Sequence, residues 1–302
     1  MSKTAFVFPG QGSQYVGMGR DLYEQSPEAR ALFEKADGIV GFPLSKVCFE
    51  GPEEELKQTK NTQPAIFLHS VIVTTLMNGE RAVMAAGHSL GEYSALVYAG
   101  ALTFEDGLRL VRLRGELMQQ AGIDKPGTMA AIIGLEPEAL NDVCKSAAAA
   151  GIVQAANYNS PGQIVISGSV AGVRKAMELA KAGGAKLVKE LPVSGAFHSP
   201  LMESAKQGLK AALDKTEIRD ATIPVYANVT AKPVLKSNDI RDLLCQQLTS
   251  PVRWHETVAN MAADGASTFV EVGPGKVLQG LVKRIDGNVT VQGVEKFSDL
   301  KL

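Results

Sequence analysis

The chain has 302 residues, of which 45% are hydrophobic and 21% charged, and its formal net charge is −1. This length and composition are typical of a globular protein with one large domain carrying an insert, or with two domains. The near-neutral charge gives no sign of nucleic acid or an anionic membrane as a partner, and three scattered cysteines without a C-x-x-C pair exclude a disulfide framework and a thiolate zinc site.

The N-terminal segment "MSKTAFVFPGQGSQ" lacks the apolar core of a signal peptide, and no apolar run approaches the length of a membrane span. We therefore expect a cytoplasmic protein that binds neither a membrane nor nucleic acid. The sequence shows no cluster of metal ligands, so we expect no metal ion.

The first part of the chain alternates strands and helices. Residues 4–8 are predicted to form a short buried strand that ends in a glycine-rich loop, and residues 20–37 a helix. A second helix follows from Thr62, with Pro64 close to its start and a long apolar run after it. The segment "AVMAAGHS" then indicates a second buried strand that runs into Ser89.

A G-x-S-x-G pattern, Gly87-His88-Ser89-Leu90-Gly91, stands between this strand and a helix of small residues, "LGEYSALVYAG". A strand, a sharp turn with serine and a packed helix form the context of a nucleophile elbow. The two glycines let the backbone turn tightly and let the helix approach the strand. We therefore predict that Ser89 is a nucleophile.

The next helix, 103–122, is amphipathic, with Thr103 as its N-cap and Gly122 just beyond its end. Of its three arginines, Arg109 and Arg112 are predicted to be solvated. Arg114 lies three or four positions from Leu110, Val111, Leu117 and Met118, so it shares the apolar stripe. Because a buried unpaired cation is costly, Arg114 requires an anion.

Residues 125–194 have a different pattern, in which strand, helix, strand, strand, helix and strand follow one another. This β-α-β-β-α-β order is typical of a ferredoxin-like unit. The turn signal Asn159-Ser160-Pro161-Gly162 joins its two middle strands. We expect a small inserted domain at 125–194, and a large domain with a parallel sheet formed from 1–124 and 195–302.

A serine hydroxyl needs a base to take its proton, and the chain has four histidines. The elbow points His88 away from the hydroxyl, His69 lies in an apolar helix, and His255 lies on a helix surface. His198, in the loop "VSGAFHSP", is the candidate that remains. No acid between Ser89 and His198 stands out, so a group other than a carboxylate is expected to orient His198.

Neither glycine-rich loop has the spacing of a nucleotide site. In "GQGSQYVGMG" the third glycine of a G-x-G-x-x-G motif is replaced by Tyr15, and "VGPGKV" lacks the phosphate-loop spacing. We interpret both segments as tight turns and expect no bound cofactor.

Five motifs in order carry a resemblance to a known family: "FPGQGSQYVGMG", "GHSLGEYSAL", "RGELMQ", "GAFHSPLM" and "EVGPGKVLQGLVKRI". They closely resemble the malonyl-CoA:acyl carrier protein transacylases of bacterial type II fatty-acid synthesis, from about Phe8 to Ile285. The resemblance implies an α/β-hydrolase-like large domain with a ferredoxin-like insert.

The same resemblance assigns roles to residues. It implies that Ser89 is the nucleophile, His198 the general acid and base, and Arg114 the ligand of the substrate carboxylate. It places the oxyanion hole at the backbone N–H groups of Gln11 and Leu90. Further family positions are Gln247, whose backbone carbonyl orients the histidine, Asn157, near the acyl group, and Phe197, which is typical of malonyl-selective members.

The implied activity is transfer of the malonyl group from malonyl-CoA to the phosphopantetheine thiol of acyl carrier protein through a malonyl-serine. We expect a monomer, with malonyl-CoA and the carrier protein as its partners. Three alternatives stay open: a serine thioesterase or hydrolase using the same Ser-His pair, a transacylase for another extender unit, and a silent homologue that only binds.

Overall fold

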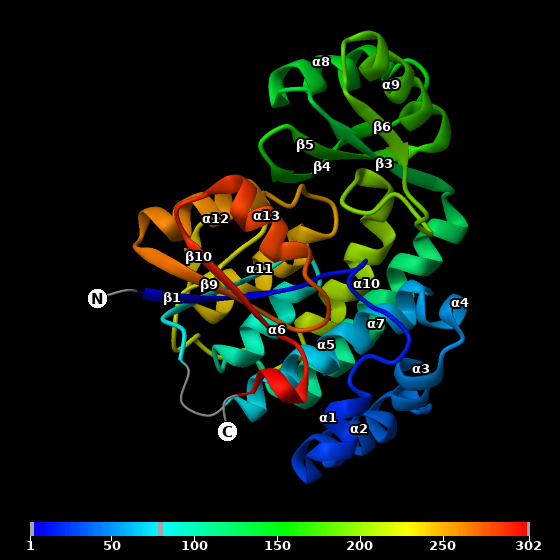
Figure 1. Ribbon diagram of the computed structural model, residues 1–302. Coiled ribbons are helices and arrows are strands. Elements are labelled where there is room, and N and C mark those ends of the chain that lie inside the picture. Colours follow the sequence, from blue (N-terminus) through cyan, green and yellow to red (C-terminus); the bar gives the residue numbers. More distant parts are fainter. Residues whose placement is uncertain (1–2, 78–80, 301–302) are drawn as a thin grey trace.

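The computed structural model describes residues 3–77 and 81–300 (Figure 1). Residues 1–2, 78–80 and 301–302 fall within the predicted large domain and lie outside the described residues.

Within the described residues, six strands form one sheet in the order β10-β9-β1-β2-β7-β8. All neighbours in it run parallel except β7 and β8, which pair antiparallel. The predicted parallel sheet is thus confirmed. Its strands are β1 (Lys3–Phe8), β2 (Met84–Gly87), β7 (Val225–Tyr226), β8 (Pro233–Val234), β9 (Ala266–Val272) and β10 (Thr290–Val294).

The central strand β1 buries both of its faces. Phe6 and Phe8 belong to one hydrophobic cluster, and Ala5 and Val7 to another. Because successive strand residues point to opposite faces, helices must cover both sides of the sheet. The helices that pack in this part of the chain are α1 (Arg20–Gln25), α2 (Pro27–Val40), α3 (Leu44–Glu50), α4 (Glu53–Leu56), α5 (Thr59–Leu76), α6 (Gly91–Tyr98), α7 (Phe104–Asp124), α10 (Glu203–Leu213), α11 (Ser237–Gln247), α12 (Trp254–Ala263) and α13 (Val277–Ile285), with short 3₁₀ turns at Pro200–Met202 and Phe297–Asp299.

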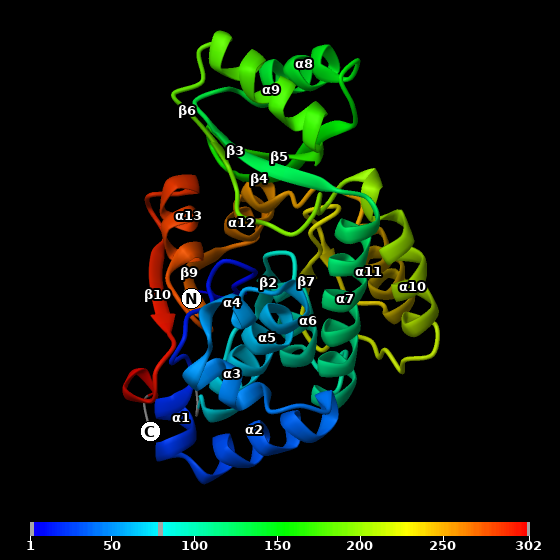
Figure 2. The same ribbon diagram turned by 90° about the vertical axis from the view of Figure 1, so that its right-hand side faces the viewer.

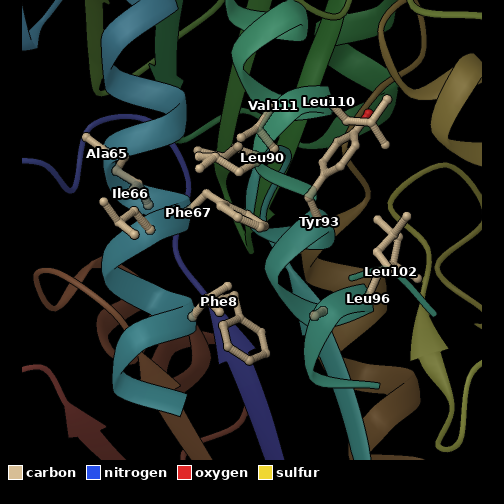
Figure 3. Packing of buried hydrophobic residues seen from close by; sticks show 14 of the residues in the cluster. Phe8, Ala65, Ile66, Phe67, Leu90, Tyr93, Leu96, Leu102, Leu110 and Val111 are labelled. Carbon is tan, nitrogen blue, oxygen red and sulfur yellow. The ribbon is translucent and has the colours of Figure 1, made fainter. Parts of the chain in front are cut away.

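The larger cluster fills the space between α5, α6 and α7, where Phe67, Leu90 and Tyr93 lie among the buried side chains (Figure 3). The other cluster joins α12 and α13 to the opposite face of the sheet through Trp254 and Leu278.

A second sheet is antiparallel and has the order β4-β5-β3-β6 within the described residues. Two helices pack on one of its faces, farther from α12 and α13 than the sheet itself (Figures 1 and 2). Its other face contributes Met129 and Val165 to the large cluster. The elements are β3 (Gly127–Ile133), α8 (Pro137–Ala147), β4 (Val153–Ser160), β5 (Gln163–Ser169), α9 (Val170–Ala182) and β6 (Leu187–Glu190).

Three expectations about helices were wrong. The helix predicted over residues 20–37 is two helices, α1 and α2, because Pro27 disfavours a helical backbone at Ser26 and the extended Ser26 caps α2 through its hydroxyl.

Helix α5 begins at Thr59, so that Pro64 lies inside it. Proline has no N–H to donate to the carbonyl four residues earlier, which belongs to Lys60. Arg112 Nη1 donates to this Lys60 oxygen over 2.9 Å and to Asn61 Oδ1 over 3.0 Å. Arg112, predicted to be solvated, therefore supplies the hydrogen bond that Pro64 removes.

The third correction concerns the end of α7. The helix continues to Asp124, and Gly122 lies within its last turn. A Cβ atom at Gly122 would stand 2.1 Å from the carbonyl oxygen of Ser194. The glycine is thus explained by close approach of the chain that leads to His198, and it does not end the helix.

Candidate active site

Ser89 occupies the sharp turn between β2 and α6. Its φ angle is 52°, in the left-handed region that residues other than glycine seldom adopt. The Ser89 N–H donates to Asn228 Oδ1 over 2.7 Å, and Asn228 Nδ2 donates to the Gly87 carbonyl over 2.6 Å. The Asn228 amide thus bridges both sides of the turn and stabilises it, as a strained nucleophile elbow requires.

The two glycines of the motif allow the strand and the helix to pack closely, because a side chain at either position would clash with backbone atoms. A Cβ atom at Gly87 would lie 1.8 Å from the carbonyl carbon of Gly91, and one at Gly91 would lie 2.1 Å from the Phe8 oxygen. The left-handed backbone belongs to Ser89 itself. Hence the glycines provide space, and the serine carries the strain of the turn.

His198 is the histidine that the structure places beside the nucleophile. Its Nε2 lies 2.9 Å from Ser89 Oγ, and its Nδ1 lies 2.9 Å from the carbonyl oxygen of Gln247. Since a carbonyl only accepts hydrogen bonds, Nδ1 must carry the proton. The unprotonated Nε2 therefore faces the serine hydroxyl, which is the arrangement of a general base.

The surroundings keep His198 neutral. Burial lowers the pKa of its imidazole to about 3, and the positive charge of Arg114 acts in the same direction. The Gln247 carbonyl acts in the opposite direction because it stabilises the imidazolium form. The other histidines lie elsewhere: His88 Nε2 is 2.9 Å from Asn159 Oδ1, His69 is buried in α5, and His255 lies on α12.

Arg114 is fully buried on α7. Its Nη2 donates to Ser89 Oγ over 3.1 Å and to Gln247 Oε1 over 2.9 Å, and its Nη1 donates to Gln63 Oε1 over 2.8 Å. The Nε–H has no partner among the described residues. All three acceptors are neutral oxygens, so the guanidinium has no direct ion pair and is suited to receive an anion next to Ser89.

Gln247 lies outside the cavity and contacts His198, Arg114 and the backbone of Ser89. Its amide nitrogen donates to the Ser89 carbonyl over 3.0 Å and to Glu92 Oε2 over 2.8 Å. Burial raises the pKa of the Glu92 carboxyl to about 7, although Gln247, the Asn228 N–H and Arg114 favour its charged form. One glutamine thus contacts the base through its backbone and the arginine through its side chain.

The serine opens into a cavity of about 220 Å³ between the two sheets. Gln11, Leu90, Asn157 and Phe197 line this cavity together with Ser89, His198 and Arg114. Within the described chain, the backbone N–H groups of Gln11 and Leu90 donate no hydrogen bond. All the predicted site residues except Gln247 therefore line one cavity, and Gln247 lies directly behind it.

Comparisons with known proteins bear on the whole chain. The family model described as "Acyl transferase domain" matches residues 5–295. A malonyl CoA-acyl carrier protein transacylase of Bacillus subtilis is 51% identical over 305 residues, covering 100% of this chain and 96% of the relative. The chain belongs to this transacylase family. The Escherichia coli K12 member is 44% identical over 301 residues, covering 99% of this chain and 97% of its own.

Solved structures of the transacylase family also match nearly the whole chain. An acyl carrier protein S-malonyltransferase from Vibrio cholerae matches with a TM-score of 0.95 at 44% identity, covering 99% of this chain and 98% of its own. A malonyl-transacylase solved in complex with a holo type II PKS acyl-carrier protein has a TM-score of 0.95 at 42% identity, covering 99% and 97%. No helix of the described residues is long and apolar enough to cross a membrane.

The site of this transacylase-family chain contains polar residues that the sequence analysis missed. Gln63 contacts Arg114, Asn228 and Glu92 support the turn, and Gln154 and Asn159 of β4 contact His198 and His88. A glutamate in the small-residue helix after Ser89 and a glutamine before Pro64 were signals that could have been used. Nothing in the local pattern distinguishes the asparagine or the two β4 residues.

Proposed function

We propose that this chain transfers the malonyl group from malonyl-CoA to the phosphopantetheine thiol of acyl carrier protein through a malonyl-Ser89 intermediate. One observation supports this proposal most directly: the oxygen of Ser89 lies within hydrogen-bond distance of both a neutral imidazole and a buried guanidinium. The first activates a nucleophile, and the second recognises an acyl group with a negative charge.

In the first half-reaction, Ser89 Oγ attacks the thioester carbonyl while His198 Nε2 takes the hydroxyl proton. The oxyanion is stabilised by the N–H groups of Gln11 and Leu90, each of which contributes about 3–4 kcal/mol in comparable sites. The C–S bond then breaks, and the coenzyme A thiolate leaves with the proton from His198. The Gln247 carbonyl holds the imidazole in place during both transfers.

In the second half-reaction, His198 takes the proton of the carrier-protein thiol. The thiolate attacks the ester carbonyl, and the C–O bond to Ser89 breaks as His198 returns the proton to its oxygen. Two half-reactions on one covalent enzyme give ping-pong kinetics.

Arg114 determines which acyl group is accepted. Its planar guanidinium binds a carboxylate through two parallel hydrogen bonds, which lysine does not reproduce. Acylation turns the Ser89 hydroxyl into an ester, so the Nη2–H that contacts Ser89 becomes available to the malonyl carboxylate. We assign Asn157 and Phe197, which line the cavity, to contact with the acyl chain.

We also propose a finer description of the fold: an α/β-hydrolase-like large domain of 1–124 and 195–302, and a ferredoxin-like small domain of 125–194. The strand order β4-β5-β3-β6 with α8 and α9 on one face supports the second part.

Intact-protein mass spectrometry tests the activity. The chain is mixed with malonyl-CoA in the absence of carrier protein, with acetyl-CoA and the Ser89→Ala variant in parallel. We expect one stable malonyl adduct that the variant lacks and that acetyl-CoA forms weakly. Rapid release of free malonate without an adduct would make the chain a hydrolase, and no adduct with no turnover would make it a binding protein.

The proposal includes a monomer that needs no cofactor, since the nucleophile, the base and the oxyanion donors are all groups of the chain. Dialysis against EDTA should leave the transfer rate unchanged. Light scattering after size exclusion should give a mass close to the 32.0 kDa of one chain. A rate lost to EDTA and restored by a metal ion would reject the first part, and a doubled mass the second.

A further inference from the structure

His198 holds a backbone conformation that has to be stabilised by its neighbours. Its φ angle is 58°, in the left-handed region, which is unfavourable for any residue that has a Cβ atom. The imidazole must nevertheless span two fixed points, Ser89 Oγ and the Gln247 carbonyl oxygen, each at 2.9 Å. A relaxation of this backbone would move the ring away from one of them.

The carbonyl of this strained residue is held by Gln154 of β4. Its amide nitrogen donates to the His198 oxygen over 2.9 Å. Because a carbonyl oxygen only accepts hydrogen bonds, the Gln154 side chain can make this contact only through its N–H group. Gln154 is half-buried and does not line the cavity, so it acts on the histidine and does not touch a substrate.

The same strand also holds the segment that carries the partner of His198. Val252 N–H donates to the Ala156 oxygen over 2.8 Å, and the Tyr158 N–H donates to the Val252 oxygen over 2.9 Å. These bonds fix the chain five residues after Gln247 to β4. The residue that carries the imidazole and the segment that carries its carbonyl acceptor are therefore both hydrogen-bonded to β4.

We propose that Gln154 is a positioning residue of the general base: its amide fixes the left-handed backbone of His198, so that Nε2 meets the Ser89 hydroxyl while Nδ1 stays on the Gln247 carbonyl. This inference rests on the proposed function, because it assumes that His198 activates Ser89. It makes the second sheet part of the support of the catalytic pair, in addition to its role in lining the cavity.

Gln154→Met tests the proposal, because methionine keeps the length of the side chain and removes the N–H. We expect the single-turnover rate of Ser89 acylation by malonyl-CoA to fall about tenfold, with KM for malonyl-CoA unchanged within about twofold. The reaction of Ser89 with phenylmethanesulfonyl fluoride should slow by a similar factor. Gln154→Lys, which keeps a donor, should stay close to the wild-type rates.

A double-mutant cycle separates positioning from general damage. In a His198→Ala background, Gln154→Met should cause no further loss, because the group through which it acts is gone. Gln292→Met, at an exposed position of β10, serves as the matched control and should leave all rates unchanged. If Gln154→Met does not fold, Gln154→Glu, which keeps a polar chain without an N–H, replaces it.

An unchanged acylation rate in Gln154→Met, or an equal loss with and without His198, would overturn the proposal. The sulfonyl fluoride reaction does not depend on the acyl substrate. It therefore reports on Gln154 even if the chain transfers a different acyl group or hydrolyses its ester. A wild-type Ser89 that reacts neither with malonyl-CoA nor with the sulfonyl fluoride would reject the proposed function itself, and the positioning role with it.

Discussion

Arg114 is a fully buried guanidinium whose three hydrogen-bond partners are all neutral. A malonyl carboxylate would satisfy this charge, whereas an acetyl group would leave it unpaired. We expect Arg114→Ala to lower kcat/KM for malonyl-CoA at least about 100-fold while acetyl transfer rises relative to it. Competition between the two thioesters, followed by mass spectrometry, measures the ratio. A variant that keeps its malonyl preference would show that another group selects the substrate.

The low pKa of His198 has a consequence for the pH profile. An ordinary histidine titrates at about 6.5, so its activity as a base falls below that pH. Burial and the charge of Arg114 lower the pKa of His198 to about 3, so the free enzyme keeps a neutral imidazole in mild acid.

The buried Glu92 carboxyl, with a pKa of about 7, is the site group that titrates in this range. In a Glu92→Gln variant, which lacks that titration, we expect kcat/KM for malonyl-CoA to change less than about twofold between pH 8 and pH 5.5. An acidic limb close to pH 6.5 in this variant, with circular dichroism showing it to be folded, would contradict the low pKa of His198.

At the scale of elements, α13 forms one wall of the cavity through Leu278 and Leu281. The buried Glu271 of β9 holds the beginning of this helix, because its carboxylate accepts the N–H groups of Leu278 and Gln279 over 3.0 and 3.1 Å. Burial nevertheless raises the pKa of this carboxyl to about 7 from an ordinary value of 4.5. Between these values the folded chain holds a proton that the unfolded chain has released, so this group destabilises the fold as pH rises.

Glu271→Gln removes that titration. The free energy of unfolding of the wild type, minus that of the variant, should decrease between pH 5 and pH 8 by an amount of the order of 3 kcal/mol. Denaturant unfolding at the two pH values measures it. Curves that shift in parallel with pH would show that Glu271 titrates as an ordinary carboxyl in the folded chain.

At the scale of the whole molecule, β4 joins the two sheets. Its backbone pairs with Val252, its Gln154 holds the His198 carbonyl, and its Asn159 meets His88 beside the nucleophile. The second sheet also shares the large hydrophobic cluster through Met129 and Val165. If the second sheet unfolded, the first would lose these hydrogen bonds and part of its hydrophobic cluster. The two sheets therefore stabilise each other.

We consequently expect one cooperative unfolding transition, although the sequence pattern suggests two domains. Differential scanning calorimetry should give a van't Hoff enthalpy equal to the calorimetric enthalpy. Two resolved transitions, or a van't Hoff enthalpy well below the calorimetric one, would show that the second sheet unfolds separately.

The sequence by itself determined the features whose cause is local. The strand-turn-helix around Ser89, the β-α-β-β-α-β order and the inward stripe of Arg114 all follow from periodicity and turn chemistry, and the structure has these elements. The same local reasoning misjudged Arg112, because the acceptor that pairs with it is a carbonyl freed by Pro64 on another helix.

Apart from the resemblance to known transacylases, only the tertiary structure decided which backbone groups meet at the nucleophile. The Gln247 carbonyl that orients His198 and the free N–H groups of Gln11 and Leu90 are backbone atoms. Every residue has a carbonyl, and every residue except proline has an N–H, so no side-chain pattern marks the ones that are used. The contact of Gln154 with His198 spans 44 positions of the chain. Such a contact arises when a strand and a distant loop pack together, which no local window of sequence records.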